Sequence, residues 1–229
     1  MLYVIGTPIG NLDDLSLRQA KTIVSSEIIL AEDTRSAQTL INYINKVYKL
    51  PATPYKLISY YKDTEFEKLP QVLQWLQEGR MVSLISESGM PIISDPGYLL
   101  IKTVIKGNIP FTVIPGPTAV ATALIYSGFN PQKYLYLGFL PKRKGAKLQL
   151  FNKLNFTVRQ QSDTVIVFFE SPKRINDTLR MINESISDAN IAICREMTKK
   201  FEEVIRGKAK DLMDRSYKGE LTVCLSLLP

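Results

Sequence analysis

The chain has 229 residues, 45% of them hydrophobic and 22% charged, so it can bury the core of one large domain or two small ones. Histidine is absent, which excludes Ser-His-Asp and Cys-His catalysis and any histidine-ligated metal; two isolated cysteines cannot form a zinc cluster, so no metal is expected. The formal net charge of +7 favours an anionic partner, with nucleic acid first, although solubility explains the charge equally well.

The sequence carries no sign of export or of membrane insertion. It begins without a basic leader, and no stretch approaches the roughly 20 apolar residues of a membrane span. Cys194 and Cys224 lie in apolar, strand-like runs that suit small buried residues in a reducing compartment. We therefore expect a cytoplasmic protein with no membrane partner.

The first half of the chain alternates between short apolar runs and helical patterns. Ser16 with Gln19 and Thr64 with Glu67 have the spacing of capping boxes at helix starts. Strict βα alternation predicts a mostly parallel sheet with helices on both faces. The expected strands are 2–5, 28–31, 57–60, 82–85 and 111–114, and the expected helices are 16–25, 36–44, 64–77 and 98–106.

The second half has a different pattern. Its last expected strands lie close together in the sequence, which predicts a mixed sheet. A loop around Pro115 and Gly116 separates the halves, so we expect an N-terminal α/β domain over 1–114 and a C-terminal mixed α/β domain over 115–229. The expected strands here are 134–139, 164–169, 191–194, 201–206 and 221–227, and the expected helices are 119–126, 146–158, 172–183 and a short one from 208.

Five of the expected strands end in loops that are rich in turn-forming or charged residues. The carboxyl ends of parallel strands meet at one edge of a sheet, so several of these loops should converge there and wrap a small molecule with backbone groups. Taken singly, each loop is explained as well by the need of tight βα turns for Gly and Pro. Neither a GxGxxG nor a GxxxxGK[ST] pattern is present. The loops are 6–11, 32–35, 86–91, 115–118 and 170–174.

The segment Glu32-Asp33-Thr34-Arg35 concentrates two acids and one base just after a strand. One interpretation has an acid orienting a substrate hydroxyl while Arg35 holds a phosphate. The other is a helix N-terminus, at which Asp33 or Thr34 caps the helix and the acids favour its dipole. Both interpretations remain open.

A basic loop in the second half, residues 140–145, is the clearest candidate for binding RNA. Tyr134, Tyr136 and Phe139 precede it, and basic residues beside aromatic ones suit an RNA backbone with unstacked bases. An ordinary exposed turn is the alternative. The expected RNA-binding residues are Lys142, Arg143, Lys144, Lys147, Lys173 and Arg174.

Five motifs together resemble the RsmI-type branch of the tetrapyrrole (corrin/porphyrin) methylase family, the small-subunit ribosomal RNA (cytidine-2′-O-)-methyltransferases. The similarity runs from Leu2 to about Leu227, and the motifs occur in register. They are Gly6-Thr7-Pro8-Ile9-Gly10-Asn11-Leu12, Ala31-Glu32-Asp33-Thr34-Arg35, Ser94-Asp95-Pro96-Gly97, Pro115-Gly116-Pro117 and Glu170-Ser171-Pro172.

The resemblance implies a two-domain α/β homodimer of the class III methyltransferase type, with S-adenosylmethionine in the cleft between the domains. It implies 2′-O-methylation of a cytidine ribose in the decoding region of 16S rRNA, as free rRNA or within the small ribosomal subunit. Carried over by motif, the expected cofactor contacts are Pro8, Ile9, Ser88, Gly89, Met90, Pro91, Ile93, Thr118 and Ala119, with Glu170 and Arg195 as further contacts at strand ends.

The chain departs from the family pattern in three places. Met90 replaces the threonine of the usual Ser-Asp-Ala-Gly-Thr-Pro loop, which removes a hydroxyl beside the cofactor. The family commonly has a histidine where this chain reads Ser59-Tyr60-Tyr61-Lys62. Long members carry a C-terminal extension, and RNA affinity that depends on it is expected to be weaker here.

Without histidine, the hydrogen-bond acceptor for a ribose hydroxyl is expected to be Asp33 or Asp95, with Arg35 and Arg174 binding flanking phosphates. Two alternatives stay open. In the first, the chain is a C-methyltransferase that acts on a corrin or porphyrin precursor, an acidic substrate that also suits a basic protein. In the second, it is an RNA-binding module with a vestigial cofactor site, an alternative suggested by Glu87 and Met90, which depart from the family loop.

Overall fold

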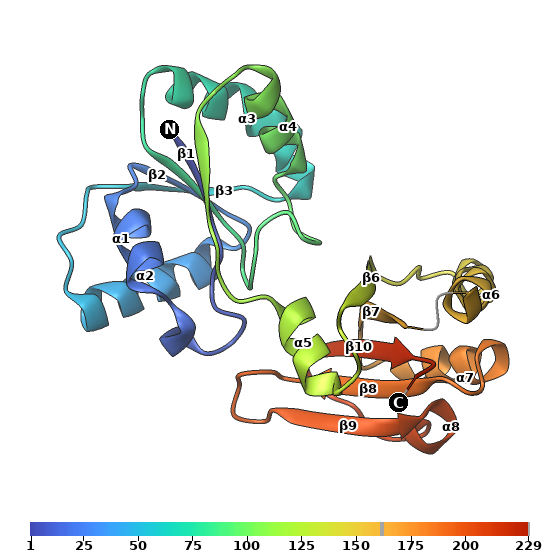
Figure 1. Cartoon of the computed structure of the whole chain (residues 1–229). Helices are drawn as coiled ribbons and strands as arrows, with labels where there is room; N and C mark the ends of the chain where they lie inside the picture. The colour runs from blue at the N-terminus through green and yellow to red at the C-terminus, as the bar shows by residue number, and fades with distance from the viewer. Residues whose placement is uncertain (161–162, 229) are drawn as a thin grey trace. The chain divides into compact units, whose positions relative to one another are not determined.

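The computed structural model describes residues 1–160 and 163–228. The chain divides into two compact units, Met1–Thr118 and Ala119–Pro229. Each unit has its own sheet and its own hydrophobic core, and Figure 1 shows the elements of both.

The N-terminal unit is built on a five-stranded parallel sheet with the order β3-β2-β4-β1-β5. Four of the five predicted strands are confirmed residue for residue. The strands are β1 (Leu2–Ile5), β2 (Ile28–Ala31), β3 (Lys56–Ser59), β4 (Val82–Ile85) and β5 (Phe111–Ile114). The helices are α1 (Leu17–Ser25), α2 (Thr34–Tyr48), α3 (Lys62–Gln77) and α4 (Tyr98–Lys106), with a 3-10 turn over Leu12–Asp14.

Side chains alternate between the two faces of this sheet, and each face meets its own pair of helices. Ile5 and Ile85 point to the face that is covered by α1 and α2. Val4 and Leu84 point to the opposite face, where α3 and α4 pack. Both faces are buried, which explains why the strands are continuous apolar runs instead of alternating ones. The parallel, doubly covered architecture expected from the sequence is confirmed.

Two helices of this unit begin earlier than the sequence patterns predict. Asp33 caps α2, accepting the N–H of Arg35 at 2.7 Å, so the helix starts at Thr34. The predicted Thr64–Glu67 capping box is wrong, because the Thr64 hydroxyl accepts the N–H of Tyr61 and α3 starts at Lys62. The Ser16–Gln19 box is confirmed at the start of α1.

The C-terminal unit has a mixed sheet with the order β6-β7-β10-β8-β9, in which only the β6–β7 pair is parallel. The strands are β6 (Lys133–Phe139), β7 (Thr164–Glu170), β8 (Asn190–Arg195), β9 (Glu203–Lys208) and β10 (Leu221–Ser226). The helices are α5 (Ala119–Ser127), α6 (Lys144–Gln160), α7 (Ile175–Ser185) and α8 (Ala209–Leu212).

Helices cover both faces of this sheet as well. Phe168 and Ile193 belong to the cluster that contains residues of α6, α7 and α8. Cys194, the next residue along β8, points the other way and lies 3.8 Å from the carbonyl oxygen of Ala123 in α5. Among the described residues, no helix combines the length and apolarity that crossing a bilayer requires.

Candidate functional site at the carboxyl edge of the parallel sheet

The loops after β1 and β4 leave the parallel sheet in opposite directions. The chain passes from β1 over β4 to β2, and from β4 over β1 to β5, although β1 and β4 are direct neighbours. Open α/β sheets bind ligands at such a point, outside the carboxyl ends of the strands. The two loops are 6–11 and 86–97, so the topology selects the two segments that carry most of the predicted cofactor contacts.

A short backbone bridge fastens these two loops together. The Thr7 N–H donates to the Gly89 carbonyl at 2.8 Å, and the Gly89 N–H donates to the Thr7 carbonyl at 3.2 Å. The buried Thr7 hydroxyl also donates toward the carbonyls of Ser86 and Gly89, each at 3.3 Å. Gly89 adopts a left-handed φ of 82°, which glycine tolerates without a steric cost.

The loop after β5 approaches the same place through two glycines. A Cβ on Gly6 would lie 2.7 Å from the Gly116 nitrogen and 2.6 Å from the Met90 sulfur. A Cβ on Gly116 would lie 2.5 Å from Nε2 of Gln19, which donates a 2.7 Å hydrogen bond to the Gly6 carbonyl. Both positions therefore require glycine. The local sequence marks Gln19 only as a capping residue, and its contact with Gly6 depends on tertiary packing that local spacing does not reveal.

The second half of the β4 loop has a strained backbone. Ile92 and Ser94 have left-handed φ angles of 76° and 73°, which are rare for residues other than glycine and especially so for a β-branched one. Ile92 is held by packing against the core cluster that contains Leu84. Strain of this kind persists where the surrounding structure enforces it, and it is common at ligand sites. Here it leads directly into Asp95.

Three carboxylates interact at this edge: Glu32 after β2, and Glu87 and Asp95 in the loop after β4. Burial raises the pKa of Asp95 to about 7, with further contributions from the charges of Glu32 and Glu87 and an opposing hydrogen bond with Ser86. Burial also raises the pKa of Glu32, helped by Glu87 and Asp33. In the sequence, Glu87 stands out only as a departure from the family loop.

Asp33 and Arg35 form a separate, exposed pair beside these carboxylates. Nη2 of Arg35 lies 2.9 Å from Oδ2 of Asp33, and hydrogen bonds from the Arg35 side chain and backbone lower the pKa of Asp33. The Arg35 side chain is 91% exposed and stands at the first turn of α2. Asp33 thus caps α2 and holds Arg35, while Asp95 has the pKa that suits proton transfer near neutral pH.

The predicted cofactor contacts of the N-terminal unit fall on these loops. Pro8, Ile9, Gly89 and Pro91 are buried, Met90 is half-buried, and Ser88 and Ile93 are exposed. Thr118 and Ala119 stand on either side of the division between the units. No group of His, Cys, Asp or Glu within the described residues could hold a metal ion.

In the C-terminal unit, Glu170 ends β7 and is completely enclosed. Its Oε2 accepts from Lys147 Nζ at 2.9 Å and from the Thr178 hydroxyl at 2.8 Å, while Oε1 accepts from the Ser171 N–H at 2.9 Å and pairs with Arg174 at 2.5 Å. With four donors around it, Glu170 has no oxygen left for a cofactor. Its contact with the cofactor stays a prediction, and these four hydrogen-bond and ion-pair partners speak against it.

The RNA-binding prediction needs one clear correction. Lys147 is 3% exposed, and its ammonium is shared between Glu170 and Thr178, so RNA cannot reach it. Arg174 is only partly exposed and is tied to Glu170 and to the Leu140 carbonyl. The remaining predicted residues, Lys142, Arg143, Lys144 and Lys173, are exposed as expected.

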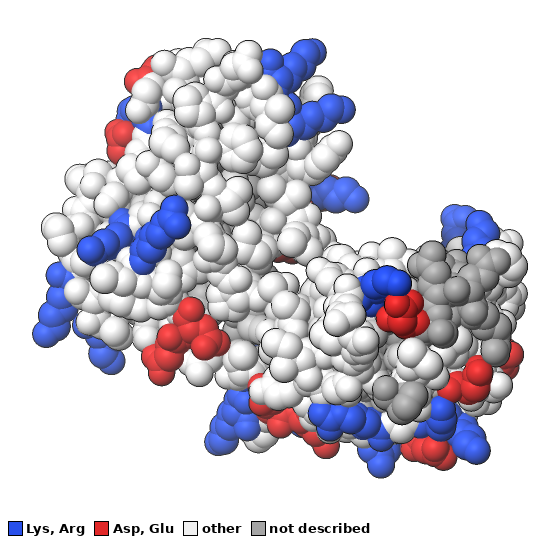
Figure 2. All heavy atoms as spheres, viewed as in Figure 1, with Lys and Arg blue, Asp and Glu red and all other residues white. Residues whose placement is uncertain are grey.

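The other predicted contact of this unit, Arg195, ends β8 and pairs with Glu203 at 2.9 Å. Arg195 and Glu170 lie on either side of Leu221, because both oppose this residue at the start of β10. On the face shown in Figure 2, Lys and Arg are interspersed with Asp and Glu over the C-terminal unit. The net charge of +7 is therefore not gathered into one patch on that face.

A sequence model of the tetrapyrrole (corrin/porphyrin) methylases matches residues 1–213, and the chain belongs to this family. Similar proteins share its fold: the methyltransferase CobJ, with a TM-score of 0.70, 16% identity and coverage of 98% of this chain and 93% of CobJ, and cobalt precorrin-4 methyltransferase CbiF, with a TM-score of 0.67, 17% identity and coverage of 100% and 96%. At these identities the likeness concerns the fold alone.

Relatives with higher sequence identity point to one branch of the family. The chain is 39% identical to ribosomal RNA small subunit methyltransferase I of Thermotoga maritima, covering 98% of this chain and 97% of the relative. It is 38% identical to the protein of the same name from Hydrogenobaculum sp., over 98% and 95%, and 36% identical to that of Halalkalibacterium halodurans, over 96% and 73%. The resemblance inferred from the strand-end motifs is confirmed.

Proposed function

We propose that this protein is an S-adenosylmethionine-dependent methyltransferase of small-subunit ribosomal RNA that methylates the 2′-hydroxyl of a cytidine ribose in the decoding region. Relatives of 36–39% identity over nearly the whole chain bear the name ribosomal RNA small subunit methyltransferase I. The observation that carries the proposal is that the β1 and β4 loops leave neighbouring strands in opposite directions and are joined by the Thr7–Gly89 bridge. The carboxylates of Glu32, Glu87 and Asp95 interact at the same edge.

The residues at this edge fit the proposed cofactor. The adenosine portion calls for backbone hydrogen-bond groups and apolar contacts, and the loops offer Ile9, Met90 and Pro91 beside closely spaced main chain. The sulfonium and ammonium groups are cationic and suit an edge that carries three carboxylates. The bound cofactor supplies the methyl group. We assign its binding to residues 8–9, 88–91 and 93 and to Thr118 and Ala119, and we leave out Glu170.

For the acceptor hydroxyl we assign Asp95 as the proton acceptor. It lies next to a strained backbone segment that fixes its place, and a pKa of about 7 lets it accept a proton near neutral pH and still hold it afterwards. Asp33 serves as the cap that orients Arg35, whose exposed guanidinium binds a phosphate of the RNA next to the target nucleotide. We expect the working form to be a cytoplasmic homodimer.

The test is a map of 2′-O-methylation on 16S rRNA from cells with and without this protein. A single cytidine that loses its methyl group without the protein, and regains it from purified protein with S-adenosylmethionine, supports the proposal. Transfer to carbon atoms of a uroporphyrin-type macrocycle instead would assign the chain to the wider family's other chemistry. Calorimetry with S-adenosylmethionine tests the alternative of an RNA-binding module with a vestigial cofactor site, because such a module would show no saturable binding.

A further inference from the structure

The C-terminal unit has a basic hollow that neither the family nor the relatives' names assign. It has a volume of about 220 Å³ and lies between the basic loop, the start of α6 and the outer face of α7. Five cations and two acids line it, and two further acids outside the lining, Glu170 and Asp214, pair with three of the cations. The lining residues are Lys142, Lys144, Lys147, Arg174, Asp177, Arg180, Met181 and Glu184.

The topology explains why the cations gather here. β6 and β7 are the parallel pair, so the loops that follow them start from the same edge of the sheet. The loop after β6 supplies Lys142 and leads into Lys144, the first residue of α6, and the turn after β7 supplies Arg174. A hydrogen bond from Nη1 of Arg174 to the Leu140 carbonyl, at 3.4 Å, ties the two loops together.

The side chains of the hollow differ in how far they are already occupied. Lys147 and Arg174 both pair with the enclosed carboxylate of Glu170 and act as a scaffold. Arg180 is held in place by Asp177 at 2.9 Å and by Asp214 at 2.5 Å. Lys142 and Lys144 have no salt-bridge partner among the described residues, so their charges face the hollow unneutralised.

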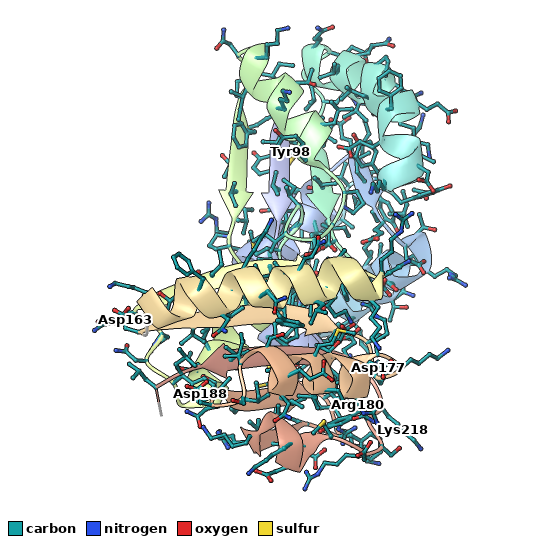
Figure 3. All side chains as sticks on the ribbon, turned by 90° about the vertical axis from the view of Figure 1, so that its right-hand side faces the viewer. Tyr98, Asp163, Asp177, Arg180, Asp188 and Lys218 are labelled. Atoms are coloured by element: carbon teal, nitrogen blue, oxygen red, sulfur yellow. The ribbon has the colours of Figure 1, made fainter. Side chains whose placement is uncertain are left out.

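Figure 3 shows the geometry from the side. Asp163 marks the region just past the C-terminal end of α6, and the labelled Asp177 and Arg180 of α7 lie toward the other end, where α6 begins at Lys144. Arg180, which two acids pre-orient, therefore lines the same hollow as two lysines with no salt-bridge partner in the described part of the chain. A tetrahedral phosphate accepts bonds from such a set, because its oxygens can meet an arginine fork and ammonium groups together.

We propose that this hollow binds a backbone phosphate of the RNA substrate, through Lys142, Lys144 and Arg180, with Glu170 as the residue that positions the scaffold. The inference rests on the proposed function and deepens it. It places the RNA contact in the hollow beside α7. It also distinguishes Lys142 and Lys144, which line the hollow, from Arg143 and Lys173, which are next to lining residues in the sequence but do not line it.

The experiment measures binding of a fluorescently labelled decoding-region RNA fragment to the full chain by anisotropy between about 50 and 200 mM salt. The variant Lys142→Gln/Lys144→Gln should weaken binding about tenfold or more and flatten the plot of log affinity against log salt by about 1.4, or 0.7 for each lost contact to single-stranded RNA. The matched variant Arg143→Gln/Lys173→Gln removes the same charge and should change the slope by less than about 0.7.

Two further single variants test the hollow, and they should change the affinity for RNA in opposite directions. Arg180→Gln should weaken RNA binding, while Glu184→Gln removes an acid from the wall and should strengthen it. Equal losses in the two double variants, or weaker binding by Glu184→Gln, would overturn the inference. Inorganic phosphate added at constant ionic strength should compete with RNA for the wild type more than for Lys142→Gln/Lys144→Gln.

Failure of the inference can be told apart from failure of the proposed function. If the wild type methylates RNA but all these variants keep its affinity and salt slope, the hollow is not a phosphate site and the function stands. If the wild type binds S-adenosylmethionine but neither binds nor methylates RNA, the proposed function fails, and the inference fails with it.

Discussion

Nζ of Lys147 lies 2.9 Å from Oε2 of Glu170, and the two side chains are 4% and 0% exposed. A charge pair this deeply buried is costly to break, because either partner alone remains as an uncompensated charge away from water. The pair joins the first turns of α6 to the end of β7, and Arg174 extends it to the basic loop. The pair therefore links the stability of the C-terminal unit to the conformation of its basic loop.

Glu170→Gln should lower the free energy of unfolding by about 3–5 kcal/mol, because it leaves the buried Lys147 ammonium without its counter-charge. Urea unfolding followed by circular dichroism measures the change. Glu184→Gln, an exposed carboxylate on α7, is the matched control and should stay within about 0.5 kcal/mol of the wild type. A Glu170→Gln midpoint equal to that of the control would contradict the assignment of a structural pair.

Gly6→Ala should destabilise the N-terminal unit by about 1–3 kcal/mol or more, since the new methyl group meets the backbone nitrogen of Gly116 at 2.7 Å and the sulfur of Met90 at 2.6 Å. It should also weaken binding of S-adenosylmethionine, measured by calorimetry. Gly145→Ala is the control: no atom lies within 4 Å of its added Cβ, and in a helix alanine is favoured over glycine by up to about 1 kcal/mol. If Gly6→Ala behaves like Gly145→Ala, the close approach is not required.

Asp95→Asn should slow methyl transfer by about 10²- to 10⁴-fold, with affinity for S-adenosylmethionine retained, because the acceptor of the hydroxyl proton is lost. For the wild type, the single-turnover rate should rise with pH through about 7, the pKa of Asp95, since the carboxylate form is the acceptor. The Asp95→Asn variant should lose this rise. An unchanged rate would remove Asp95 from the mechanism.

The same substitution has a stability effect of defined sign. The folded state raises the pKa of Asp95, so the protonated carboxyl is favoured on folding, and this stabilisation disappears as pH rises through about 7. Asp95→Asn should therefore be more stable than the wild type at pH 8, and the difference should shrink toward about pH 4. A variant that is both slower and more stable cannot be explained by damage to the fold.

Lys49→Gly should stabilise the N-terminal unit by about 1 kcal/mol. Lys49 ends α2 in the left-handed region at φ 48° and ψ 40°, where a residue with a Cβ is disfavoured and glycine is not. The side chain is exposed and loses no packing. Thermal unfolding measures the gain, and Lys46→Gly, inside the same helix, should instead cost about 1 kcal/mol.

Much of the fold could be predicted because the core strands are short, apolar and bounded by turn formers. For this reason the sequence predicts strands 82–85 and 111–114 to the residue. The strand order was not predictable in the same way, since it depends on which helices cover which face. Lys147 shows the same limit at the site: its charge suggested RNA, but only the position of Glu170 across the core explains why it is buried. Arg180 belongs to an ordinary amphipathic helix, and nothing in its local sequence distinguishes it.

The place of β1 in the sheet bears on how the protein is made. It is synthesised before either of its two neighbours, β4 and β5, which end at Ile85 and Ile114. This interior strand must therefore wait, apolar and unpaired, until β4 has been synthesised, and its other edge stays unpaired until β5 follows. Pairings this distant in sequence form slowly, and strands exposed meanwhile are prone to aggregation. The N-terminal unit is thus the part of the chain that a chaperone at the ribosomal exit would most benefit.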